Sequence, residues 1–230
     1  MHNLLAIETS EETCSAALRT GGDCMELFES EPRKHSELIL PMIDRLMAEA
    51  GLQRGSLDAV AFGRGPGSFT GVRIATAVAQ GIGFALDIPV VPVSTLQALA
   101  QGAYRQAGAR QVLAALDARM QEVYWGAFRC DDNGLVDPLG GEAVCAPQRV
   151  RVPTPGHWVG AGSGWASYGE VLVTQCRMES ADIYPDQKPH AADVARLAAE
   201  SFRLGNAVSA EQAVPVYLRD NVAVHPGQKA

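Results

Sequence analysis

The chain has 230 residues, of which 47% are hydrophobic and 20% charged, and its formal net charge is −7. This length suits one large domain or two small lobes, and the acidic balance argues against a protein that grips nucleic acid alone, because neutralising phosphates dominates such binding. No apolar run reaches the length of a membrane span and the N-terminus lacks the features of a secretion signal, so we expect a cytoplasmic protein without membrane contact.

The first half of the chain predicts three strands joined by hairpins, followed by alternating helices and strands. The expected strands are 4–7, 14–18 and 24–29, with Gly21-Gly22 as a hairpin turn. A helix over 36–52 has Ser36 as its expected N-cap, Pro41 in its second turn and Gly51 at its end. Then come strand 59–62, helix 70–86, strand 88–93 and helix 95–106. This order predicts a mixed sheet with helices on its faces.

The stretch 63–86 organises this half of the chain. Four glycines and a proline lie within nine residues and lead into a helix whose only polar side chains are Arg73, Thr76 and Gln80. The glycine loop is either an anion-binding loop at a helix N-terminus or a structural turn capped by Ser68 or Thr70. The turn is favoured, because the Walker Lys-Ser/Thr pair and GxGxxG are both absent. The helix has so little polar surface that it must be buried on nearly every side.

The second half repeats the plan of the first in part. Residues 112–128 read as strand, polar turn and strand, like residues 4–18, and Asp117 stands where Glu8 does. An irregular connection over 145–156, a strand over 157–160, an amphipathic helix over 190–204 and an extended segment over 215–219 follow. We predict an N-terminal lobe over 1–109, a smaller lobe over 110–205, and a C-terminal tail over 206–230. The sequence does not assign this tail to either lobe.

Two sets of residues suggest chemistry between the lobes. Glu8, Thr9, Ser10 and Asp117 are candidates to hold a magnesium–nucleotide, or they are two solvated turns. The glycine run with Gly162 and Gly164 is either a cradle for adenosine or phosphate or an ordinary turn. The five histidines show no HxxxH or HExxH pair and no GxSxG elbow exists, so neither a metal site nor a serine hydrolase is expected.

Four segments together resemble the TsaB (YeaZ) family: GRGPGSFTGVR (63–73), VSTLQALAQGA (93–103), DARMQEVYW (117–125) and PVYLRDNVA (215–223). The resemblance implies an α/β, actin-like ATPase fold (ASKHA, ribonuclease H-like), with two related lobes that each hold a mixed sheet flanked by helices. It implies a role in making N6-threonylcarbamoyladenosine (t6A) in tRNA, at the adenosine 3′ of the anticodon. The chain would be a non-catalytic subunit that supports TsaD, the metal-binding paralogue that transfers the threonylcarbamoyl group.

The same resemblance implies the partners of the chain. These are TsaD by direct contact, TsaE in a ternary complex, and a second copy of the chain in a homodimer when TsaD is absent. Contact with tRNA is only indirect. No cofactor is expected to bind tightly, and the resemblance leaves ATP or ADP open for the assembled complex.

Two departures from catalytic relatives support a subunit without a catalytic residue or a metal. Thr95 and Leu99 stand where TsaD-like proteins carry an HxxxH pair, and neither side chain coordinates as imidazole does. Glu8 replaces the aspartate of the usual DTS or DTA hairpin, so Glu8, Thr9, Ser10, Asp117, Gly162 and Gly164 are expected to be at most a vestigial nucleotide site. The rival interpretations are a stand-alone ATPase or small-molecule kinase and, less favoured, a metallopeptidase.

The family resemblance also implies what buries the apolar helix. Helices 36–50 and 70–86 would pack against the matching pair of another subunit. Gly71, Ala75, Ala79 and Gly83 recur every four residues, so we expect close helix approach along their face, with Arg73 and Gln80 setting the register. The expected interface residues are Leu38, Met42, Leu46, Gly71, Val72, Arg73, Ala75, Ala79, Gln80 and Gly83.

Overall fold

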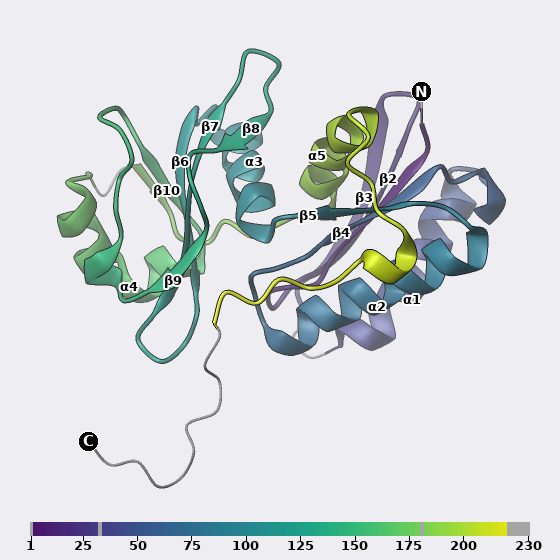
Figure 1. Ribbon diagram of the computed structural model, residues 1–230, viewed down its shortest axis with the longest axis horizontal. Coiled ribbons are helices and arrows are strands. Elements are labelled where there is room, and N and C mark those ends of the chain that lie inside the picture. The colour runs from purple at the N-terminus through teal and green to yellow at the C-terminus, as the bar shows by residue number, and fades with distance from the viewer. Residues whose placement is uncertain (1, 32–33, 180–181, 220–230) are drawn as a thin grey trace, which may run out of the picture.

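Two mixed β-sheets form the framework of the computed structural model, which describes residues 2–31, 34–179 and 182–219 (Figure 1). The first sheet has the order β3-β2-β1-β4-β5. Hairpins make β1, β2 and β3 antiparallel, whereas β4 and β5 follow helices and run parallel to β1. Its elements in chain order are β1 (Leu4–Glu8), β2 (Cys14–Thr20), β3 (Asp23–Glu29), α1 (His35–Glu49), β4 (Ala59–Gly63), α2 (Phe69–Leu86) and β5 (Val90–Val93).

The second sheet repeats the pairing of the first. Strand β6 is antiparallel to β7 and parallel to β10, as β1 is to β2 and β4, and Asp117 ends β6 as Glu8 ends β1. This confirms the predicted duplication of the lobe. The remaining elements are α3 (Thr95–Ala107), β6 (Gln111–Asp117), β7 (Val123–Cys130), β8 (Val136–Pro138), β9 (Ala143–Cys145), β10 (Val159–Ala161), α4 (Ser163–Cys176), β11 (Ile183–Tyr184) and α5 (Ala191–Arg203).

Alternating side chains of the strands separate the layers of the molecule. Leu5 and Ile7 of β1 face α1 and α2, whereas Leu4 and Ala6 face α5 on the other side of the sheet. In the second sheet Leu113 and Ala115 join Trp165 of α4, and the alternate residues of β6 face α3. Helices α3 and α5 contact each other between the two sheets, so α1 and α2 form one outer layer and α4 the other (Figure 1).

Each predicted lobe contributes one helix to the sheet of the other lobe. The lobes of the structure therefore differ from the predicted boundaries. Helix α3 belongs to the predicted segment 1–109 but packs on β6, β7 and β8 of the second sheet. Helix α5 belongs to the predicted segment 110–205 but packs on β1, β2, β4 and β5 of the first. The tail begins on the first lobe, where Val208 pairs with Val90. Residues 220–230 of the predicted tail lie outside the described residues.

Three local predictions also differ from the structure. Helix α1 begins at His35, one residue before the expected Ser36 cap, and its N-cap Lys34 makes no side-chain hydrogen bond. Helix α4 was not expected, because the glycine run before it reads as a turn. The expected strand 157–160 is β10, which starts two residues later, at Val159.

Candidate functional site

Helix α2 carries two rows of small residues, and they face opposite ways. Gly71, Ala75, Ala79 and Gly83 are buried against the chain's own first sheet. A Cβ at Gly71 would lie 1.9 Å from the carbonyl oxygen of Thr9, and one at Gly83 would lie 2.7 Å from Val90. The expectation that this row contacts a partner is therefore wrong, since close packing inside the chain accounts for it.

Other expected interface residues also make their contacts within the chain. Val72, Met42 and Leu46 are buried in the chain's own core. Gln80 donates a hydrogen bond through Nε2 to the carbonyl oxygen of Ala213 at 2.7 Å, so its amide does not set register at a seam. Of the expected set, Arg73 is exposed and Leu38 is half-buried.

The second row of α2, Ala77, Gly81 and Ala85, faces outward. These three residues are exposed, and so are the phenyl rings of Phe69 and Phe84, at 58% and 76%. By length and composition alone the helix would pass as a membrane span, but six of its residues are buried in the chain. The apolar residues of α2 that no core contact explains thus lie in one outward stripe.

No contact among residues 2–31, 34–179 and 182–219 explains why position 81 is a glycine. A Cβ at this position would meet nothing within 4 Å, and the residue sits in the middle of α2. A mid-helix glycine costs about 1 kcal/mol relative to alanine. Because no contact of the described residues requires that cost, Gly81 fits a site where another backbone approaches the helix closely.

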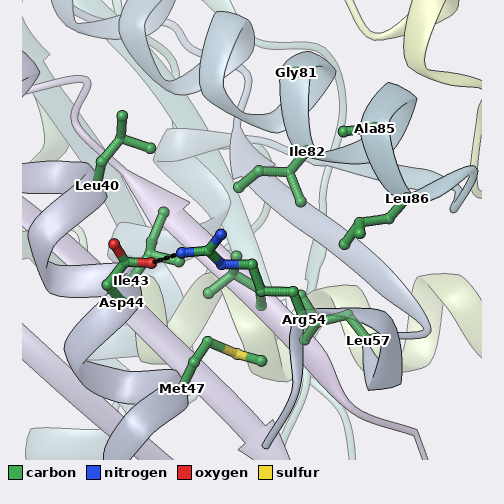
Figure 2. Close-up of a pocket in the computed structure, with 11 residues that line it drawn as sticks. Leu40, Ile43, Asp44, Met47, Arg54, Leu57, Gly81, Ile82, Ala85 and Leu86 are labelled. Carbon is green, nitrogen blue, oxygen red and sulfur yellow. Dashed lines mark hydrogen bonds and ion pairs between the residues drawn. The ribbon is translucent and has the colours of Figure 1, made fainter.

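A groove separates α1 from α2 beside this stripe (Figure 2). Its volume is about 340 Å³, and its apolar walls come from Leu40, Ile43 and Met47 on one side and Ile82, Ala85 and Leu86 on the other. The side chain of Arg54 reaches across the groove and donates to Asp44 at 2.8 Å (Figure 2). A helix laid over α1 and α2 has here both a close approach at Gly81 and an apolar groove for side chains.

The glycine loop packs against the tip of the first hairpin and occupies the space that a ligand would need there. Glu8, Thr9 and Ser10 are all buried, at 1%, 0% and 0% exposure. Thr9 Oγ1 donates to the carbonyl oxygen of Gly71 at 2.7 Å, and the carbonyl oxygen of Ser10 accepts from the amide of Ser68 at 2.6 Å. The loop is glycine-rich because the hairpin tip touches it, and Ser68 caps α2 by accepting from the amide of Gly71.

Glu8 is enclosed too completely to act as a magnesium ligand in this arrangement. Its Oε1 accepts from the amide of Ser10 at 2.6 Å, and a Cβ at Gly63 would lie 1.9 Å from its Oε2. Burial raises the pKa of the Glu8 carboxyl, which favours the neutral acid. Thr95, where an HxxxH histidine would stand, lies behind it with its hydroxyl 3.4 Å from Oε2.

In the second half of the expected nucleotide site Asp117 is half-buried, and the two glycines pack against β6. Asp117 accepts from the amide of Arg119 at 2.8 Å and from its guanidinium at 3.0 Å. A Cβ at Gly162 would lie 2.5 Å from the carbonyl oxygen of Ala115, and one at Gly164 would lie 2.8 Å from Ala115 Cβ. Packing against β6 explains both glycines without a bound nucleotide. Leu99 is fully buried, and no group of three metal-ligating side chains occurs within residues 2–31, 34–179 and 182–219.

The sequence did not predict one contact between the lobes, which involves a titratable carboxyl group. Glu11, in the turn after Glu8, accepts from the hydroxyl of Ser163 at 3.1 Å, and that hydroxyl accepts from the amide of Asp117. Burial raises the pKa of Glu11 to about 7. No local signal marks this pair, because 152 residues separate its members.

The matches to known proteins include one family model, two curated relatives and one solved structure. A family model described as TsaD, tRNA N6-adenosine threonylcarbamoyltransferase, matches residues 29–226. The chain is 42% identical to the tRNA threonylcarbamoyladenosine biosynthesis protein TsaB of Escherichia coli strain K12, over 96% of each chain. It is 39% identical to TsaB of Haemophilus influenzae, over 95% of this chain and 94% of that one. The solved structure of YeaZ from Pseudomonas aeruginosa superposes with a TM-score of 0.89 at 47% identity, covering 95% of this chain and all of that one.

Proposed function

Because the chain belongs to the TsaB (YeaZ) family of tRNA threonylcarbamoyladenosine biosynthesis proteins, we propose that it serves t6A formation as a non-catalytic subunit that binds and supports TsaD. Its two related lobes have the actin-like fold that the family resemblance implies. TsaD carries out the transfer, and this chain supplies a surface on which TsaD is held in its active form.

The observation that carries the proposal is the outward stripe of α2. Gly81 stands open at its centre, two phenylalanines are exposed at its ends, and the groove between α1 and α2 runs beside it. A matching pair of TsaD helices would bury this stripe and complete a four-helix contact. In the absence of TsaD a second copy of the chain takes the same place, which gives a homodimer.

The rival function, a stand-alone ATPase or small-molecule kinase, needs an open phosphate site at the first hairpin. Glu8, Thr9 and Ser10 are buried beneath the glycine loop, and this disfavours the rival. We therefore expect no tightly bound cofactor on this chain alone, with ATP or ADP bound, if at all, in the assembled complex. TsaE joins that complex, tRNA contacts it through the other subunits, and the assembly acts in the cytoplasm.

The test compares a glycine of the outward stripe with a helical glycine of the second lobe. Gly81 of α2 and Gly169 of α4 both lie in helices and both have open space where a Cβ would be. Gly81→Arg places a charged side chain on the docking stripe, whereas Gly169→Arg places one on the outer face of the second lobe. Each variant is mixed with TsaD from the same organism, and binding is measured by sedimentation and calorimetry.

The proposal predicts that Gly81→Arg loses TsaD binding and self-association while its thermal unfolding stays close to that of the parent. Gly169→Arg binds like the parent. Full binding by Gly81→Arg would overturn the proposed docking face. ATP turnover by the purified chain alone would instead favour the rival function.

A further inference from the structure

The C-terminal strap, residues 206–219, runs from α5 across the first lobe to the second. Val208 pairs with Val90, and a short 3-10 helix, Ala210–Gln212, packs on α2. Ala213 accepts from Gln80, and the amide of Val216 donates to the carbonyl oxygen of Arg64 at 2.8 Å. The strap is thus fixed along α2 by main-chain and side-chain hydrogen bonds.

At the start of α2 the strap and the helix together form a cation–aromatic patch, made of Phe69, Arg73 and Tyr217. The guanidinium carbon of Arg73 lies 3.7 Å above the centre of the Phe69 ring. Arg73 Nε donates to the Tyr217 hydroxyl at 2.9 Å, and the two rings lie 5.8 Å apart. All three side chains are exposed, so a flexible arginine is held in one position at the surface.

Arg73 needs a negative partner if this surface is covered. It is the only charged residue of α2, and within the described ranges no carboxylate lies within 4.0 Å of its nitrogen atoms. The stack on Phe69 and the bond from Nε leave the two terminal nitrogens of the guanidinium for another group. Burying an unpaired charge is strongly unfavourable, whereas a planar fork held in place matches a carboxylate with two hydrogen bonds.

We infer that the C-terminal strap is part of the docking surface, and that the cation–aromatic patch receives a carboxylate side chain from a helix of the TsaD partner. The inference rests on the proposed function, because the patch continues the exposed stripe of α2 from Phe69 toward Gly81. It adds the chemistry of the contact: an Asp or Glu of the partner opposite Arg73, with Tyr217 as the positioning residue.

The far end of the strap is anchored on the second lobe. The Arg219 guanidinium donates to the carbonyl oxygen of Ala118 at 3.1 Å and to the carboxylate of Glu122 in the turn between β6 and β7. None of these hydrogen bonds involves a residue of α2. A change at Arg219 therefore reaches the patch only through the strap that it holds.

The first experiment changes the charge at the patch and measures the Kd for TsaD. Arg73→Glu is expected to weaken binding about 100-fold, and Arg73→Lys about 10-fold, because lysine keeps the charge but loses the planar fork. Arg129→Glu is the matched control: the side chain of this exposed arginine of β7 hydrogen-bonds only Thr154 among the described residues. Raising salt weakens binding of the parent more than that of Arg73→Met, since only the parent keeps the ion pair.

The second experiment tests the strap itself. Tyr217→Phe and Arg219→Ala are each expected to weaken binding about threefold, as the loss of a positioning hydrogen bond would do. In Arg219→Ala, hydrogen exchange of the Val216 amide becomes faster, because that amide is held to Arg64 only while the strap lies in place. In an Arg73→Met background Tyr217→Phe has no further effect.

The outcomes separate this inference from the proposed function. If Gly81→Arg abolishes binding but Arg73→Glu binds like the parent, the docking face stands and the carboxylate contact is refuted. If Val216 exchanges faster in Arg219→Ala with no change in Kd, the strap is structural only and its place in the docking surface is refuted. If Gly81→Arg binds fully, the proposed function fails first.

Discussion

Glu11 offers the sharpest test of the interlobe contact, because one substitution removes its charge and keeps its shape. Its carboxylate accepts from Ser163 of the second lobe, and burial raises its pKa from 4.5 to about 7. Lys188 opposes this rise, whereas Glu8 and Glu12 add to it. Glu11→Gln retains an oxygen that accepts from Ser163 and cannot ionise.

The sign of the effect follows from the raised pKa. Below pH 4.5 the carboxyl is protonated in both the folded and the unfolded chain, so it does not change stability. As pH rises from 4.5 to 7 the unfolded chain releases the proton first, and the folded protein loses stability. The shift corresponds to about 3 kcal/mol, and the loss is complete above pH 7. For a chain of this length that is about 6–12 °C in Tm.

The assay is urea denaturation of the parent and of Glu11→Gln at pH 5 and pH 8. We expect the free energies of unfolding to differ by less than about 1 kcal/mol at pH 5 and by about 3 kcal/mol at pH 8, with the variant more stable. Glu170→Gln is the control, because that side chain is exposed on α4 and does not contribute to the raised pKa of Glu11. Equal stabilities of the parent and Glu11→Gln at pH 8 would show that the carboxyl is not buried between the lobes.

Three further substitutions test packing inside the chain, each by urea denaturation. Arg105→Ala leaves the buried carboxylate of Asp193 without the two hydrogen bonds at 2.8 and 2.9 Å and is expected to cost about 3–5 kcal/mol; a cost below 1 kcal/mol would contradict it. Gly63→Ala forces a methyl group against Glu8 and is expected to cost about 3 kcal/mol, much of it recovered by adding Glu8→Ala; no recovery would mean that the strain lies elsewhere. Ser68→Ala removes the N-cap of α2 and is expected to cost about 1 kcal/mol, whereas Ser68→Asp keeps the cap, so equal losses would argue against capping.

Local signals in the sequence predicted most elements of the fold. Alternating apolar residues and Gly21-Gly22 predict the first hairpins, and the apolar stripe with Val194, Leu197 and Ala198 predicts α5, whose stripe is buried. The correspondence of Glu8 and Asp117 predicted the duplicated lobe. Which sheet α5 covers could not be predicted, because the exchange with α3 depends on contacts across the whole chain.

The outward stripe of α2 shows that helical spacing alone cannot tell which face of a helix is exposed. Both rows of α2 consist of small residues four apart, so spacing alone does not tell the inner row, with Ala79, from the outer row, with Gly81. The positions of Phe69, Arg73 and Phe84 distinguish the two rows, because these large side chains lie on the outer side with Gly81. Ala79 is buried in the core, so a charge there is expected to unfold the chain.

Reconstituted threonylcarbamoyl transfer tests the central claim most directly. TsaD, TsaE, threonylcarbamoyl-AMP and tRNA are combined without this chain, with the parent chain, with Gly81→Arg and with Gly169→Arg, and t6A in the tRNA is measured. The account predicts transfer with the parent and with Gly169→Arg, and none without the chain or with Gly81→Arg. Full transfer in the presence of Gly81→Arg, or in the absence of the chain, would contradict it.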